Sequence, residues 1–163
     1  MRVTDKHYPQ LMRLYVPPPG RADTRALDEA RKSLAQGGIP IGAVIVDVNT
    51  RAVLARGHNR FAQSGSHVAH GEMEALAALG PIDKAAWKDL AVVTTMVPCE
   101  MCAGAFVRFG IPLCIAAERE TYPGAEEYLV QHGVQVVVLD DAEVRQMMVE
   151  WIATPEGRAL WEA

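Results

Sequence analysis

Hydrophobic and polar residues follow one another along this chain in blocks that predict alternating strands and helices. The segment 41–48 (IGAVIVDV) is nearly all apolar and rich in β-branched residues, as expected for a buried strand. Shorter apolar runs predict further strands at 52–56, 90–96, 113–117 and 134–139. Helices are expected to begin near residues 23, 70, 99, 141 and 155. The segment 57–69 has the composition of a loop.

The order of these segments predicts an α/β fold. Elements in the order α-β-β-α-β-α-β-α-β-α indicate a mixed sheet covered by helices on both faces. In the first helix Asp23 is the expected N-cap, and Leu27, Ala30 and Leu34 recur on what should be its buried face. Residues 1–24 are predicted to be an N-terminal extension with a connector at Pro17–Gly20, and residues 25–163 to be one domain.

Composition and charge limit the classes of function and partner that we expect. The formal net charge is −4 and the isoelectric point about 5.7, whereas proteins that grip a phosphate backbone are usually basic. A long nucleic acid is therefore not the first expected partner, although a local basic patch stays open. No apolar run has the roughly 18–20 residues of a membrane span, and no signal peptide is evident. Three cysteines do not make a disulfide framework, so we expect a soluble cytoplasmic protein.

Two short motifs carry the chemistry. His70-Gly71-Glu72 and Pro98-Cys99-Glu100-Met101-Cys102 match the H-x-E and P-C-x-x-C signature of zinc deaminases. Cys99 and Cys102, three residues apart at a helix start, should point to one side, and the helix dipole favours their thiolates. With the His70 imidazole they form a donor set that suits one Zn²⁺ per chain. Three protein ligands leave the fourth tetrahedral position for water, as in catalytic zinc sites.

Glu72 is the expected proton carrier. A carboxylate beside zinc-activated water can take its proton and pass protons to a ring nitrogen and a leaving amine. Taken alone, C-x-x-C could instead be a redox pair or half of a four-cysteine zinc site, but there is no second pair, and Cys114 stands alone on an apolar strand. A non-catalytic zinc-stabilised interaction domain would have no need of Glu72.

The motifs resemble those of the cytidine-deaminase-like superfamily, and most closely the small fungal-type cytosine deaminases. Beyond HGE and PCEMC, the matching stretches include GGIPIGAVIVD (37–47), RGHNRF (56–61) and FGIPLC (109–114). The resemblance implies a three-layer α-β-α sandwich around a mixed five-stranded sheet, and a homodimer built by the helices that carry the zinc ligands. It also implies that Glu72 is the proton shuttle. The implied base-binding residues are Asn59, Ile41, Gly71, Tyr122, Trp161 and Glu162.

Two departures from the family pattern leave the substrate open. Tyr122 stands where the family has a phenylalanine lid, and the tail RALWEA differs in spacing from the family's tryptophan and aspartate. Deamination of free cytosine to uracil and ammonia is the first expectation. Deamination of tRNA adenosine, guanine or another aminated heterocycle remains an alternative. The tail could also be simply an amphipathic helix packed on the body.

Overall fold

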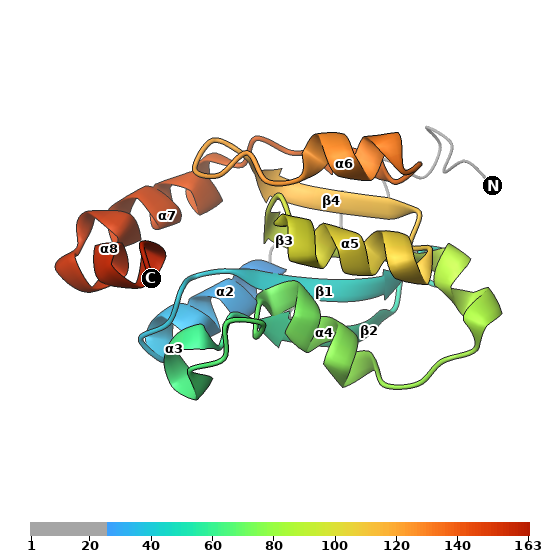
Figure 1. Cartoon of the computed structure of the whole chain (residues 1–163), viewed down its shortest axis with the longest axis horizontal. Helices are drawn as coiled ribbons and strands as arrows, with labels where there is room; N and C mark the ends of the chain where they lie inside the picture. The colour runs from blue at the N-terminus through green and yellow to red at the C-terminus, as the bar shows by residue number, and fades with distance from the viewer. Residues whose placement is uncertain (1–25) are drawn as a thin grey trace.

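The computed structural model describes residues 26–163 (Figure 1). The expected extension 1–24, its proline-rich connector and the Asp23 cap lie outside the described residues. In the described part, five strands form one sheet in the order β2-β1-β3-β4-β5. The strands are β1 (Gly42–Asp47), β2 (Val53–His58), β3 (Leu90–Met96), β4 (Leu113–Glu118) and β5 (Gln135–Val138). β1 pairs antiparallel with β2 and β3, while β3, β4 and β5 run parallel, so the predicted mixed sheet is confirmed.

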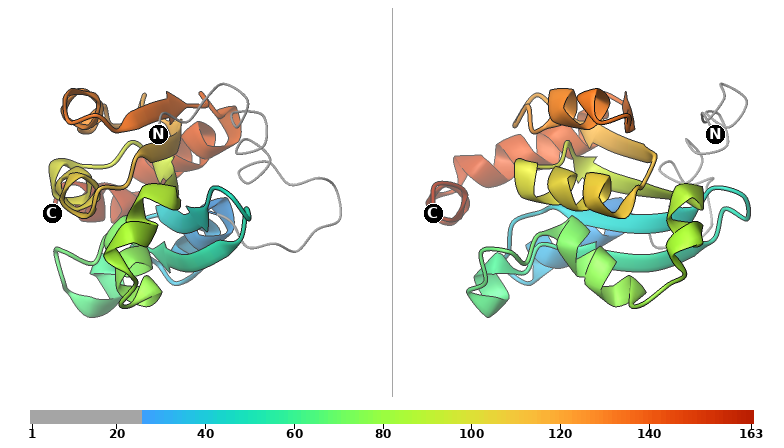
Figure 2. Two further views of the ribbon diagram at one scale, coloured as in Figure 1. Left: turned by 90° about the vertical axis from the view of Figure 1, so that its right-hand side faces the viewer. Right: turned by 45° about the vertical axis from the view of Figure 1, so that its right-hand side comes forward.

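Helices cover both faces of the sheet and make three layers. α4 (Gly71–Leu79), α5 (Glu100–Phe109) and α6 (Glu126–Gln131) lie in front of the sheet in Figure 1, whereas α2 (Ala26–Ala35) and α7 (Ala142–Ala153) lie behind it (Figure 2). Successive strand residues point to opposite faces. Ile45 accordingly packs in a cluster with Phe106 of α5, and Val44 packs in another with Val144 of α7. The three-layer α-β-α sandwich is thus confirmed.

The buried face of α2 differs from the prediction. Ala30 is buried as expected, but Leu34 is 39% exposed, and the buried positions include the polar Glu29 and Ser33. The hydrophobic pattern alone did not predict this face, because the buried polar side chains form hydrogen bonds with residues that are distant in the sequence. The expected loop 57–69 also holds the end of β2 and a short helix, α3 (Phe61–Ser64).

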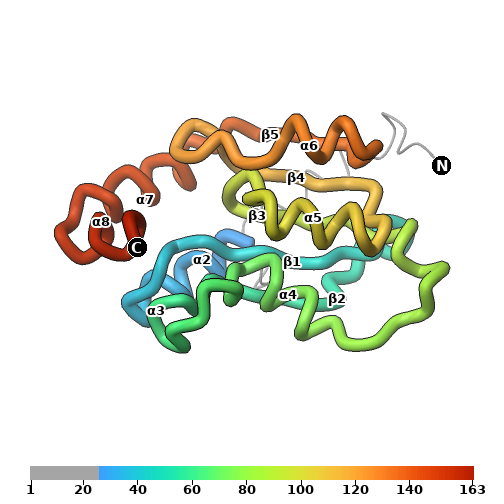
Figure 3. The backbone as a smooth tube through the Cα atoms, viewed as in Figure 1, coloured from blue at the N-terminus to red at the C-terminus, as the bar shows by residue number. Residues whose placement is uncertain are grey.

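The elements place one end of the sheet beside the C-terminal helices. The carboxyl ends of β3 and β4 lie toward α8 (Pro155–Trp161), and so do the first turns of α4 and α5. The segment that joins α4 to the 3₁₀ helix Lys84–Asp89 lies at the opposite end (Figure 3). A small apolar cluster that includes Met96, Trp151 and Trp161 fills this end. No helix within residues 26–163 has the length and apolar character needed to cross a membrane.

Candidate active site

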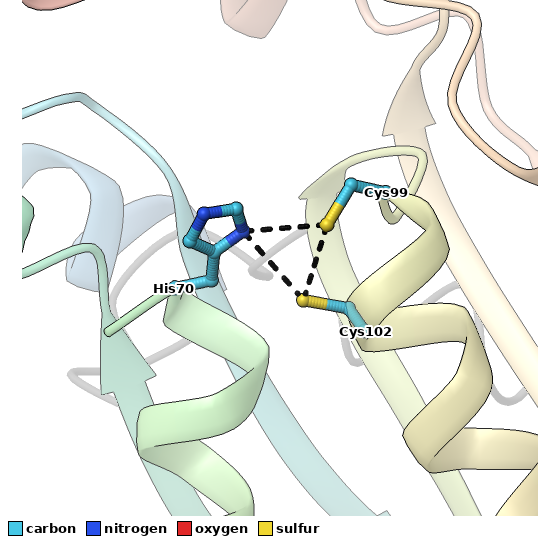
Figure 4. A group of neighbouring side chains, drawn as sticks. All are labelled: His70, Cys99 and Cys102. Carbon is cyan, nitrogen blue, oxygen red and sulfur yellow. Dashed lines mark hydrogen bonds between the residues drawn. The ribbon is translucent and has the colours of Figure 1, made fainter. Parts of the chain in front are cut away.

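The first turns of two neighbouring helices bring the three predicted metal ligands together. His70 is the N-cap residue of α4, Cys99 is the N-cap residue of α5, and Cys102 lies in the first turn of α5. His70 Nδ1 lies 3.4 Å from Cys99 Sγ and 3.7 Å from Cys102 Sγ, and the two sulfur atoms are 3.7 Å apart (Figure 4). The three side chains therefore face one common point.

This geometry fits a zinc ion. Two sulfur atoms bound at about 2.3 Å with tetrahedral angles would be separated by roughly 3.8 Å, and a sulfur and a nitrogen by roughly 3.6 Å. The separations of 3.7 Å and 3.4–3.7 Å are close to these values. The donor atoms of His70, Cys99 and Cys102 form a group within 4.8 Å of one another that could hold a metal ion. The Cys₂His donor set is borderline to soft and leaves one position open, as a catalytic zinc requires.

The two thiols differ in their affinity for protons. A hydrogen bond from the Cys102 thiol, supported by one from His70, lowers the pKa of Cys99 to about 4. The same contact with Cys99, together with burial, raises the pKa of Cys102. The hydrogen bond with Cys99 also raises the pKa of His70. These directions favour the thiolate at Cys99 and the thiol at Cys102, and a divalent cation that binds both sulfurs must displace any thiol proton.

Glu72 lies beside this group in a buried position. Its side chain comes from the first turn of α4 and is 4% exposed, and Oε2 is 3.5 Å from Cys102 Sγ. Burial is the main cause that raises the pKa of Glu72, while a hydrogen bond from Thr94 Oγ1 to Oε1 at 3.0 Å opposes this rise. A carboxyl group with a raised pKa, held rigidly beside a metal site, is well suited to exchange protons near neutral pH.

A pocket of about 350 Å³ opens onto the metal group and Glu72. Apolar and aromatic side chains make most of its wall, as is usual for small-molecule sites. Its lining includes Ile39, Ile41, Asn59, Phe61, His67, His70, Glu72, Met96, Val97, Cys99, Tyr122, Leu160, Trp161 and Ala163. The Tyr122 and Trp161 rings meet edge to face with centroids 6.4 Å apart, and Phe61 and His67 form a second ring pair at 4.8 Å. Aromatic rings from separate segments therefore form part of the pocket wall.

Asn59 presents a defined chemical group to this pocket. It is 2% exposed, and its Oδ1 accepts a hydrogen bond from the Phe61 amide at 3.0 Å. Because that bond engages the carbonyl oxygen, the side-chain NH₂ is the group that remains to serve a ligand. Asn59 is thus arranged as a hydrogen-bond donor, which suits a ring carbonyl.

The structure places the other residues implied by the resemblance as follows. Ile41, Tyr122 and Trp161 line the pocket, and the Tyr122 hydroxyl donates to Glu100 Oε2 at 3.3 Å. Gly71 begins α4 so close to β1 that an added Cβ would lie 3.2 Å from the Ile41 oxygen. Glu162 lies outside this pocket, on a separate depression with Arg158, because successive residues at a helix end point about 100° apart and Trp161 faces inward.

Sequence reasoning missed several residues of the site. Thr94, whose hydroxyl donates a hydrogen bond to Glu72, lies in the otherwise largely apolar strand β3. A polar residue in such a strand is the sequence feature that could have identified it. Phe61 and His67 flank the pocket from a stretch that we expected to be loop, where composition gave no hint of their position. Leu160 reaches the pocket from α8.

Comparisons with known proteins agree with this geometry. Residues 21–118 match the family model for the cytidine and deoxycytidylate deaminase zinc-binding region. A cytosine deaminase from Candida albicans is 40% identical over 127 residues, covering 78% of this chain and 84% of that protein. A tRNA-specific adenosine deaminase from Streptococcus pyogenes serotype M18 is 36% identical over 121 residues, covering 68% of this chain and 74% of that protein.

A solved structure of a guanine deaminase from Nitrosomonas europaea shares the fold. The match has a TM-score of 0.61 and covers 94% of this chain and 91% of that chain at 23% identity. The family match includes His70, Glu72, Cys99 and Cys102, the residues that the fold gathers at one end of the sheet. The chain therefore belongs to the family of zinc-dependent cytidine and deoxycytidylate deaminases.

Proposed function

We propose that this protein hydrolyses the amino group of a free nucleobase, with cytosine as the first substrate. The composition of the pocket wall carries this proposal. Within residues 26–163, the pocket is lined, apart from the metal ligands and Glu72, by apolar and aromatic side chains, Asn59 and His67, and by no lysine or arginine. A nucleotide would leave its phosphate without a cation there. A flat uncharged base can instead pack between the ring pairs.

The chain's own residues divide the reaction between binding and proton transfer. Zinc, when bound to His70, Cys99 and Cys102, supplies a Lewis acid that lowers the pKa of water. Glu72 is positioned to accept one proton of the attacking water and deliver it to a ring nitrogen, and then to carry the second proton of that water to the amino group, which leaves as ammonia. The apolar walls exclude bulk water and strengthen these interactions.

Asn59 and the ring pairs would select the substrate. The Asn59 NH₂ would donate to the ring carbonyl of cytosine, and Ile41, Tyr122 and Trp161 would pack on the ring. The first turns of α4 and α5 leave the backbone N–H groups of Gly71 and Cys99 without partners in their own helices. These groups are further donors for the ligand. Because Glu162 lies outside the pocket, it has no part in this proposal.

Ammonia release from free cytosine tests the proposal. We expect the zinc-loaded protein to release ammonia and form uracil, and the Glu72→Gln protein, which has the same side-chain volume, to release none above background. Absence of release by the unaltered protein would refute cytosine as the substrate, and guanine and other aminated heterocycles would then be tested.

Deamination of adenosine in tRNA is the second candidate function. The 36% identity to a tRNA-specific adenosine deaminase supports it. An anticodon stem-loop is therefore the matched substrate in the same assay. Turnover of the stem-loop that weakens steeply with salt, without turnover of cytosine, would favour this candidate.

Replacing Thr94 by valine should shift the pH profile of the reaction. The Thr94 hydroxyl donates to Glu72 Oε1, which stabilises the carboxylate and lowers its pKa. Without this bond the pKa of Glu72 rises. When the pH is lowered, the carboxylate is therefore protonated at a higher pH than in the unaltered protein. We expect the acidic limb of kcat/KM to move upward by about one pH unit. A limb at the original pH would mean that this bond does not tune Glu72.

We also propose that two copies pair through the layer formed by α4 and α5. Phe109 at the end of α5 is 41% exposed and stacks on Trp87, which provides an apolar surface for such a contact.

We further propose that the protein acts in the cytoplasm on pyrimidine bases that a cell salvages. The half-buried Cys99 must stay reduced to bind a metal, which favours a reducing compartment.

A further inference from the structure

The face of α2 that packs on the sheet carries polar side chains with no role in the chemistry described above. Glu29 is 6% exposed and Ser33 is fully buried, and their spacing of four residues places them on one side of the helix. Buried polar groups are normally retained with specific partners, because leaving them unpaired is unfavourable. Their partners therefore indicate what this face does.

Both side chains have a partner at the end of β2 or just after it, at His58 or Asn59, and Glu29 also pairs with Lys32 at 3.6 Å. Glu29 Oε2 lies 2.9 Å from His58 Nδ1, and Gln36 Oε1, just beyond α2, lies 3.1 Å from His58 Nε2. A carboxylate oxygen only accepts, so Nδ1 carries the hydrogen of the bond to Glu29. The ring of His58 is thus held by its bond to Glu29 and lies beside the side-chain amide of Gln36, immediately before Asn59 in the chain.

Ser33 holds the next residue directly. Its single hydroxyl hydrogen is shared between two backbone carbonyl oxygens, that of Asn59 at 2.8 Å and that of Ile39 at 2.6 Å, and so links the end of β2 to the segment that leads into β1. The backbone N–H of Asn59 in turn donates to the backbone carbonyl oxygen of Ile41 at 2.8 Å. The backbone of Asn59 is consequently held from both sides, while its side-chain NH₂ is left to the pocket.

We infer that Ser33, Glu29 and His58 are positioning residues that hold the Asn59 NH₂ at the place of the substrate's ring carbonyl. Neither Ser33 nor His58 lines the pocket, so they act through Asn59 and do not touch the substrate. Loss of this support should weaken recognition of the carbonyl while the metal ligands and Glu72, which come from α4 and α5, stay in place. The inference rests on the proposed function, since it concerns base recognition.

The test compares cytosine with 4-aminopyrimidine, which carries the reacting amino group but lacks the ring carbonyl. We expect Ser33→Ala and His58→Phe to lower the ratio of kcat/KM for cytosine to kcat/KM for 4-aminopyrimidine by about tenfold or more, at unchanged zinc content. Leu34→Ala, on the exposed side of the same helix, is the matched control and should leave the ratio unchanged. A ratio equal to that of the unaltered protein in both variants would overturn the inference, since a purely structural defect lowers both rates together. If His58→Phe fails to fold, the milder Ser33→Ala decides.

A second measurement is independent of turnover. The side-chain NH₂ signal of Asn59 in ¹H–¹⁵N spectra, assigned by its loss in Asn59→Ala, should shift or broaden in Ser33→Ala but not in Leu34→Ala, in zinc-loaded protein without substrate. If the unaltered protein does not deaminate cytosine, the proposed function fails and this signal decides alone. A displaced signal then supports the positioning role, and a signal unmoved in Ser33→Ala and His58→Phe overturns it.

Discussion

Replacing Glu72 by alanine should abolish turnover by about four orders of magnitude while the protein keeps its fold and its zinc. The carboxylate is not one of the three metal donors: its Oε1 accepts a hydrogen bond from Thr94 Oγ1 at 3.0 Å, and its Oε2 lies 3.5 Å from Cys102 Sγ. Its loss removes a buried proton carrier from beside the metal group. Water cannot replace it efficiently in a pocket with mainly apolar walls, because a proton must be held there between its release and its delivery.

The measurement is ammonia release at saturating substrate, with zinc content determined on the same sample. Glu74→Ala is the matched control, because Glu74 lies two residues further along α4 and pairs with Arg60 at the surface, with 3.3 Å between Nη1 and Oε2. We expect the control to stay within a few-fold of the original rate. A Glu72→Ala protein that retained a rate within tenfold of the original would show that the proton is carried by another group.

The metal group was predictable because its geometry is local. The spacing of Cys99 and Cys102 within one helical turn, and the position of His70 at another helix start, fix the directions of the three donors once those helices form. The remaining step was to bring two helix starts together. β1 pairs antiparallel with both β2 and β3, so the carboxyl ends of β2 and β3, which precede α4 and α5, lie at the same edge of the sheet, and both helices pack on the same face.

Residues that depend on distant partners were not predictable in the same way. Ser33 and Glu29 resemble ordinary exposed positions of an amphipathic helix, and only the fold shows that the end of β2 meets them. Glu162 shows the converse. The family resemblance implies a base-binding role for it, but its side chain lies in a separate depression with Arg158, while Trp161 lines the pocket.

Replacing Cys99 by alanine should remove both zinc and activity. Two donors, His70 and Cys102, would remain, and the site would lose the negative charge of a thiolate ligand at Cys99, whose pKa is lowered to about 4. Loss of an outer partner of a metal ligand typically weakens metal binding roughly 10- to 100-fold, so loss of a ligand itself should weaken it further. The fold should survive in large part, because Cys99 is only half-buried and lies outside the packed centre of the sheet.

Zinc content after dialysis against a weak chelator measures this effect, and Cys114→Ala is the matched control. Cys114 is a buried residue of β4 that packs in the core and is not part of the metal group. Its replacement removes only a small apolar volume, so we expect a modest loss of stability, about 1 kcal/mol, with zinc and activity retained. Full zinc occupancy and activity in Cys99→Ala would refute the ligand assignment. Equal zinc loss in both variants would mean instead that the metal site responds to general loosening of the core. The contrast between the two cysteines therefore separates direct coordination from structural support.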